Sequence, residues 1–209
     1  MMEHHKNKTS SKIPSILLIG ALPPPVHGGN ISFQRILESG IDKSFSFDLI
    51  DSSGHQKLEK IGKVSINSVL TALKVLITLF FKLLIKRYKI VYFILSPAPP
   101  AIYRDMAIIL IIKLLTNTKI ITHLHGGTAI IDHYNSGNGF YKTLFDYSIT
   151  KIDKMIVLSK IYSDLFNGFL KDENIEVIYN GVQSPITHLK NRNRKIVSYM
   201  GIISKEKGF

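Results

Sequence analysis

Two short clusters of glycine and histidine residues have the types and spacing to do chemistry. Gly28 and Gly29 follow a proline-rich turn, and His27 precedes them. Because glycine has no Cβ, the atoms of a ligand can approach its backbone closely. A helix capped by Asn30 or Ser32 would point its free N–H groups and positive dipole end at this loop. We therefore predict phosphate binding here, with an ordinary tight turn as the alternative.

The second cluster is His123-Leu124-His125-Gly126-Gly127, at the end of an apolar segment. In a strand His123 and His125 share one face, so both rings would lie on the same side of a sheet. The pair suits hydrogen bonding to a hydroxylated ligand, and a satisfied structural histidine is the bland alternative. As a metal pair the two histidines would need Asp132 or His133 as a third ligand, and we expect no metal.

These clusters need a scaffold, and the hydrophobic pattern predicts one in which strands and helices alternate. Strands are expected at 15–21, 46–51, 90–95, 119–125, 154–158 and 176–179; helices are expected at 31–39, 65–87, from Pro99-Pro100 to Leu115, 141–150 and 159–169. This alternation predicts an α/β fold, a parallel sheet with helices on both faces. Ligands of such sheets bind at the carboxyl ends of the strands, where both clusters fall.

Changes in composition predict the boundaries of the domains. Residues 1–12 form a basic tail that we expect to be disordered, and the apolar run after it is a first core strand rather than a signal peptide. The main domain covers 13–181. Residues 182–195 are polar and basic, which is typical of a linker. A new strand at 196–200 then begins a second, truncated domain that reaches 209.

The composition limits the partners. The chain of 209 residues has a net charge of +12 and no cysteine, which excludes disulfides and cysteine metal sites. Positive charge favours anionic partners. Neither an RNA-binding aromatic motif nor zinc-finger spacing is present, so nucleic acid is not expected and an anionic membrane face fits better. The apolar face of the 65–87 helix is expected to pack on the sheet, with a helix lying on a membrane surface as the alternative.

Five short motifs in this order resemble the GT-B glycosyltransferases of family 4, which retain anomeric configuration. The matching segments are Leu22-Pro23-Pro24-Pro25-Val26-His27-Gly28-Gly29, His123-Leu124-His125-Gly126-Gly127, Val157-Leu158-Ser159, Val177-Ile178-Tyr179-Asn180-Gly181-Val182 and the stretch from Gly201 to Gly208. The resemblance implies a Rossmann-like acceptor-side domain, followed by the first strand of the domain that binds the nucleotide-sugar donor.

The resemblance also implies roles for individual residues. Gly28 and Gly29 match the loop near the donor diphosphate, and Lys207 matches the lysine that steadies the leaving phosphate. His125 matches the catalytic histidine beside the transferred sugar. Further candidates for binding acceptor or sugar in the matching motifs are His27, Asn30, His123, Gly126, Gly127, Ser159 and Asn180. The family typically needs no metal, so the nucleotide-sugar is the only expected co-substrate.

The resemblance therefore predicts a hexosyltransferase that acts on a glycan or glycolipid acceptor, in the cytoplasm or at the inner face of the plasma membrane. Ile202 stands where relatives often carry an arginine, so one phosphate contact differs. The donor domain, with its two glutamates, has no counterpart in 209 residues. We thus expect little or no transfer by this chain alone. The alternatives are a non-catalytic Rossmann-like binding module and one subunit of a split enzyme with a donor-domain partner.

Overall fold

The strands of this protein form one parallel six-stranded sheet in the order β2-β1-β3-β4-β5-β6. The structure is a computed structural model that describes residues 13–24, 26, 28–54, 65–97, 99–126 and 129–181. The strands are β1 (Ser15–Gly20), β2 (Ser46–Asp51), β3 (Ile90–Leu95), β4 (Lys119–Leu124), β5 (Lys154–Val157) and β6 (Ile175–Val177). The predicted α/β fold is confirmed, and the architecture is Rossmann-like.

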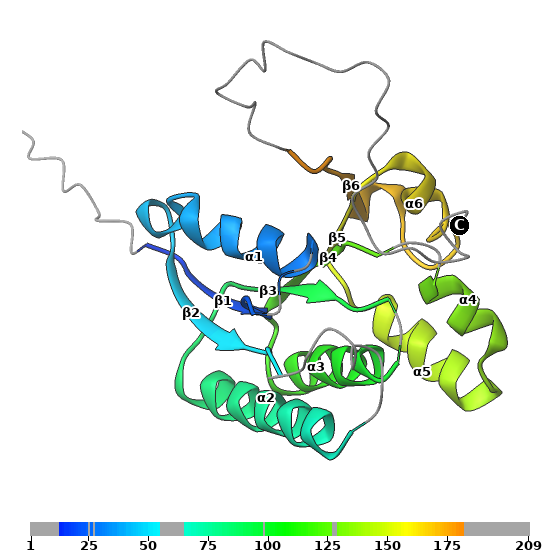
Figure 1. The fold of residues 1–209 in the computed structure, drawn as a ribbon, viewed down its shortest axis with the longest axis horizontal. Coiled ribbons are helices and arrows are strands. Elements are labelled where there is room, and N and C mark those ends of the chain that lie inside the picture. Colours follow the sequence, from blue (N-terminus) through cyan, green and yellow to red (C-terminus); the bar gives the residue numbers. More distant parts are fainter. Residues whose placement is uncertain are drawn as a thin grey trace, which may run out of the picture.

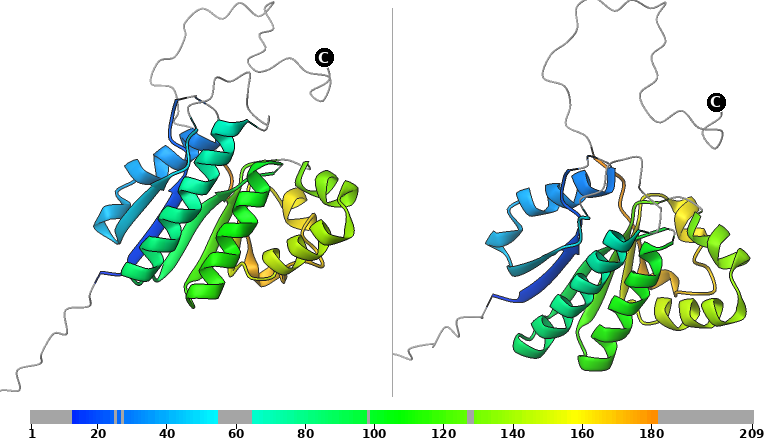
Figure 2. Two further views of the ribbon diagram at one scale, coloured as in Figure 1. Left: turned by 90° about the horizontal axis from the view of Figure 1, so that it is seen from below. Right: turned by 60° about the horizontal axis from the view of Figure 1, so that its bottom comes forward.

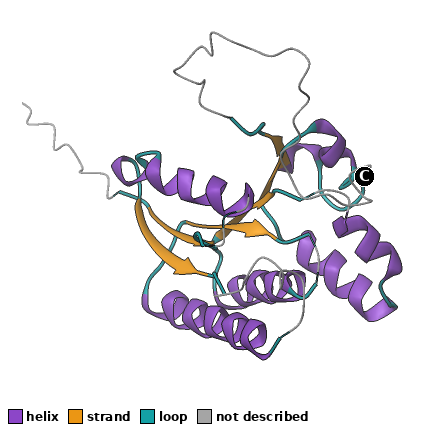
Figure 3. Ribbon diagram, viewed as in Figure 1, coloured by secondary structure: helices purple, strands orange, loops and turns teal. Residues whose placement is uncertain are grey.

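Helices connect successive strands, and the alternation is visible in Figure 3. They are α1 (Gly28–Glu38), α2 (Ile66–Ile85), α3 (Ala101–Leu115), α4 (Ala129–Ser136), α5 (Gly139–Ile149) and α6 (Lys160–Asp164), with short 3-10 turns η1 (Ile41–Lys43) and η3 (Asp172–Asn174). Parallel strands require such crossovers, because a tight turn can join only antiparallel neighbours.

The two faces of the sheet are covered unequally. Helix α1 lies on one face, and α2 and α3 lie on the other (Figures 1 and 2). On the α1 face Phe33 packs against Ile16, Leu18 and Tyr92. The opposite face carries the larger core, which joins alternate residues of the same strands, such as Leu17 and Ile19, to α2, α3 and α5. Helices on both faces were predicted, and the structure confirms this.

The local sequence explains where the long helices lie. Ser65 caps α2, because its side chain accepts a hydrogen bond from the Ser68 backbone N–H while the Ser68 hydroxyl accepts one from the backbone N–H of Ser65. Helix α3 is apolar on nearly every side. It is accordingly packed between α2 and α5, and six of its residues are buried.

The sequence placed most elements within one or two residues, and three places were wrong. Helix α1 begins at Gly28 rather than 31, so Asn30 and Ser32 lie inside the helix and do not cap it. Helix α4 was not among the predicted helices. Helix α6 ends at Asp164 instead of 169, and turns follow it, in which Gly168 has a φ of +91° that suits glycine. The predicted tail, linker and final strand lie outside the described residues.

Candidate functional site

The sheet reverses its winding between β1 and β3. These strands are neighbours, but the chain leaves β1 toward β2 on one side and later builds β3 to β6 on the other. At such a reversal the loops that leave the two strands part, and ligands bind outside the carboxyl ends. The loop from β1 to α1 and the loop from β3 to α3 flank this point. The histidine motif follows β4, the next strand along the sheet.

The first turn of α1 presents backbone N–H groups at this edge. Since α1 begins at Gly28, the N–H groups of Gly28 and Gly29 belong to the first turn, where the helix supplies no carbonyl to accept their hydrogen bonds. A Cβ built on Gly28 would meet no heavy atom of the described residues within 4 Å, so this backbone is open to approach. Asn30 is buried and helps to seat the turn on the domain. The geometry can hold an anion.

His123 and His125 lie on the α1 face of the sheet, with ring centroids 3.9 Å apart. The register pairs His123 with Ile94 and Ile156, on the face where Phe33 packs. The Tyr92 hydroxyl and Nδ1 of His123 share a hydrogen bond of 2.8 Å. The ring of Phe33 in turn stacks on Tyr92 at 6.5 Å. A line of four rings therefore runs from the packing core of α1 to the edge of the sheet.

Burial keeps both histidines neutral at pH 7. It lowers the pKa of His123 to about 4, with a smaller contribution from the neighbouring His125, and it lowers the pKa of His125 as well. Within the described part of the chain, both ring nitrogens of His125 and Nε2 of His123 are buried without a hydrogen-bond partner. Buried polar groups are usually paired. A neutral imidazole can both donate to and accept from a hydroxyl, so this site suits a hydroxylated ligand.

The loop after β3 and the loop after β4 are in close contact beside the histidines. A Cβ on Gly126 would lie 2.5 Å from Cβ of Pro97, so the loop after β4 can touch the loop after β3 only with glycine at 126. The β3 loop is itself held by the fully buried Asp105, which accepts the Ser96 backbone N–H at 2.7 Å and pairs with Arg104 at 2.7 Å. Gly126, predicted to bind acceptor or sugar, therefore has a structural part in the site.

The remaining described candidates lie at the same edge with other contacts. Ser159 caps α6 by accepting a hydrogen bond from the Tyr162 backbone N–H at 3.4 Å. Asn180 follows β6 and is exposed. Next to it, the carbonyl of Gly181 accepts a hydrogen bond from Arg35 of α1 at 2.8 Å, which ties the end of the described domain to that helix. The predicted residues His27, Gly127 and Lys207 lie outside the described residues.

His133, one of the two residues considered as a third metal ligand, has other contacts. His133 contacts the rings of Tyr103 and Tyr141, with its Nε2 3.4 Å from the Tyr103 hydroxyl. In the ranges that the structure describes, no three histidine, cysteine, aspartate or glutamate side chains gather as metal ligands would. The His123–His125 pair is thus flanked by aromatic and backbone groups.

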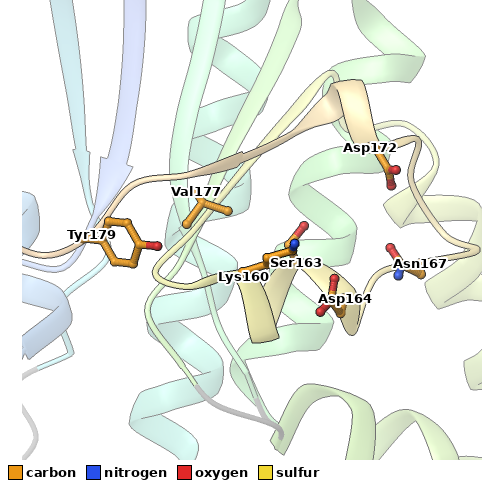
Figure 4. Close-up of a pocket in the computed structure, with 7 residues that line it drawn as sticks. All are labelled: Lys160, Ser163, Asp164, Asn167, Asp172, Val177 and Tyr179. Atoms are coloured by element: carbon orange, nitrogen blue, oxygen red, sulfur yellow. The ribbon is translucent and has the colours of Figure 1, made fainter.

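An open pocket of about 440 Å³ lies at the edge of the sheet formed by α6 and β6. Figure 4 shows the side chains of α6 and the following turn on one side of it and Tyr179 on the other. Its lining is Lys160, Ser163, Asp164, Asn167, Asp172, Val177 and Tyr179. The lining contains none of the predicted site residues.

Several residues of this site were missed from the sequence. Tyr92 is the single hydroxyl in the apolar run 90–95, and this signal could have marked it as a partner for a polar group on the next strand. Arg35, Pro97 and Asp105 gave no comparable signal, because their contacts join distant segments.

In comparisons with known proteins, no protein-family model matches this chain, and no curated protein matches it.

Proposed function

We propose that this chain is the acceptor-binding half of a retaining glycosyltransferase, which transfers a sugar from a nucleotide-sugar to a lipid-linked or polysaccharide acceptor. The observation that carries the proposal is the neutral imidazole of the half-buried His125, whose two ring nitrogens are themselves buried and have no hydrogen-bond partner among the described residues. Sugars are dense in hydroxyl groups that both donate and accept hydrogen bonds. A neutral imidazole at a water-poor edge can pair with such a hydroxyl at either nitrogen.

The anion-binding geometry at the same edge supports the second half of the proposal. Departure of a nucleoside diphosphate builds negative charge on the leaving oxygens. The first-turn N–H groups of α1 at Gly28 and Gly29 are fixed donors, which stabilise such charge without reorganising. This arrangement uses no metal and agrees with the order of motifs in the sequence.

The proposal is tested by following the histidine rings and the α1 amides of the 209-residue chain by NMR. Short alkyl glycosides are added in one titration and uridine diphosphate in another. We expect the glycosides to shift the His125 ring signals and the diphosphate to shift the amides of Gly28 and Gly29. His125→Ala is expected to weaken glycoside binding about tenfold or more, the cost of a lost buried hydrogen bond.

His133→Ala is the matched control, since this histidine sits among Tyr103 and Tyr141 and not beside His123. It is expected to bind glycosides as the parent chain does. His125→Gln, which keeps a donor and an acceptor, guards against a variant that merely misfolds. Glycoside binding that His125→Ala leaves unchanged would contradict the proposal. Diphosphate binding without any glycoside binding would favour a phosphate-binding module.

A further inference from the structure

The outward face of α2 is apolar along its whole length. Toward the domain, α2 buries Val75, Leu79 and Leu83. The opposite face repeats large apolar side chains every three or four residues, and the exposed fractions of these residues run from 40% to 84%. These nine residues, which we name the α2 outer face, are Ile66, Val69, Leu70, Leu73, Ile77, Phe80, Phe81, Leu84 and Ile85.

Such a helix is unusual on a surface that meets water. A surface helix normally turns charged and polar residues outward, and a helix that is apolar all round is buried or lies in lipid. The neighbouring helix α3 shows the buried case, because α2 and α5 cover it from two sides. Nothing in the described part of the chain covers the α2 outer face in this way. Contiguous apolar surface of this kind marks a docking site.

The packing of α2 limits how it could meet a membrane. In the described residues α2 is the one helix long and apolar enough to cross a bilayer by length and composition. It is also part of the domain, because it packs on α3 and β2 and its Val75, Leu79 and Leu83 belong to the main core. Crossing the bilayer would require these contacts to break. Lying on the bilayer surface would keep them all.

We propose that the α2 outer face docks on the surface of an anionic lipid bilayer. The charge of the protein selects this occupant: the chain carries +12, and α2 contains no acidic residue. Lys74 on α2 and Arg87 just beyond it are exposed beside the apolar residues. Lysine and arginine can reach phosphate headgroups while neighbouring apolar side chains enter the acyl boundary. A second copy of the chain would instead bring two strongly positive molecules together.

Docking would also fix the height of the candidate site above the lipid surface. Helix α2 follows β2, so its first turn at Ile66 starts from the edge of the sheet where the strands end. That is the edge that carries His125 and the start of α1. The inference rests on the surface of α2 alone and holds whichever reaction the site performs.

The test is flotation of the 209-residue chain with vesicles of phosphatidylcholine alone or with 30% phosphatidylglycerol. We expect strong binding to the anionic vesicles, weaker binding to the neutral ones, and partial release by 0.5 M salt. The double variant Leu73→Gln and Ile77→Gln is expected to lower the partition coefficient tenfold or more. Lys74→Gln with Arg87→Gln is expected to reduce binding to anionic vesicles and the salt dependence while leaving neutral vesicles unaffected.

Leu114→Gln is the matched control, because Leu114 is a leucine at the end of α3 that is even more exposed (84%) than Leu73 (51%) and lies outside the α2 outer face. It is expected to bind vesicles like the parent chain, and thermal melts check that every variant folds. His125→Ala should also bind vesicles normally, so failure here and failure of the transferase proposal remain distinct.

Four outcomes would overturn the inference. The first is a parent chain that does not float with anionic vesicles. The second is a Leu73→Gln and Ile77→Gln variant that binds as the parent does. The third is a stable dimer in vesicle-free buffer that this double variant converts to monomer, since the face would then join two copies of the chain. Resistance to extraction at alkaline pH would show a spanning helix instead and would also overturn it.

Discussion

Neutral histidines are the chemical core of the candidate site, and burial makes them so. Nδ1 of His123 and the hydroxyl of Tyr92 share a hydrogen bond, and the ring of His123 lies against the ring of His125. Placing one positive charge here would cost solvation, and placing two would add repulsion between the rings. The chemistry of the pair therefore suits a neutral polar ligand at physiological pH, and protonation of the rings in acid would remove their hydrogen-bond acceptors.

The stability of the fold should consequently depend on pH. The pKa of His123 is about 4 in the folded chain and 6.5 when unfolded, so the unfolded state binds more protons between these values. Its contribution is complete above pH 6.5 and is lost as the pH falls toward 4. We expect a loss of about 2 kcal/mol between pH 7.5 and 5, measured by urea denaturation.

His123→Gln should reduce the dependence of the unfolding free energy on pH. His133→Gln replaces a histidine outside the pair and should leave this dependence unchanged. Asp48, whose pKa is also lowered, cannot produce the same effect. Its contribution to the free energy of unfolding is lost only when the pH falls below its ordinary pKa of 3.8. An unchanged slope in His123→Gln would contradict the assignment. His125 contributes with the same sign, since its pKa is also lowered.

The contact between Gly126 and Pro97 gives a second prediction at the scale of single residues. Alanine at 126 would bring its Cβ to 2.5 Å from Pro97, closer than carbon atoms can approach, so one of the two loops must move. We expect Gly126→Ala to cost about 1–3 kcal/mol in the free energy of unfolding, measured by urea denaturation. Gly139→Ala is the control, because a Cβ there meets nothing within 4 Å at the start of α5. It should be neutral or stabilise by about 0.5 kcal/mol.

At the scale of elements, one buried carboxylate shapes the β3–α3 connection. Asp105 lies in the second turn of α3 and reaches back to the Ser96 backbone N–H, just beyond the end of β3. Its other oxygen holds Arg104. Because Pro97 lies in this loop, the same carboxylate also fixes the surface on which Gly126 rests.

Removing this carboxylate should loosen the loop. Asp105→Ala leaves the Ser96 N–H and the Arg104 guanidinium without their partner, and we expect a loss of about 3 kcal/mol in unfolding free energy. Asp105→Asn keeps one acceptor and should lose less. Hydrogen exchange at Ser96 measures the local effect: faster exchange in Asp105→Ala than in Asp105→Asn is expected, and equal exchange would contradict the bracing role.

The elements that the sequence predicted well are those with an unambiguous apolar pattern. Strand β3, with five apolar residues around Tyr92, and the long helix α2 were placed nearly to the residue. The start of α1 was missed because Gly28 and Gly29 have low helix propensity, and tertiary packing through Phe33 outweighs it. The early end of α6 was also missed, because residues 165–169 continue the apolar pattern while the chain there forms turns that include the left-handed Gly168.

At the scale of the whole molecule, the sheet separates two surfaces of different character. His123 and His125 lie on the face that α1 partly covers, whereas the α2 outer face looks away on the other side of the sheet. The sequence could predict the two histidines and the apolar helix separately. It could not predict that they lie on opposite sides, because this follows from the reversal of winding between β1 and β3.

This separation sets the distance between a membrane under α2 and the histidine pair. If α2 rests on lipid, one helix layer and the thickness of the sheet stand between the bilayer and the histidine pair, a height of roughly 15 Å. A headgroup of one small sugar is too short to cover this height without leaving the membrane. An acceptor that carries several sugar units or a flexible phosphate spacer is long enough. If the proposed transferase function holds as well, the position of α1 opposite α2 would favour acceptors whose glycan or spacer extends far enough above the bilayer.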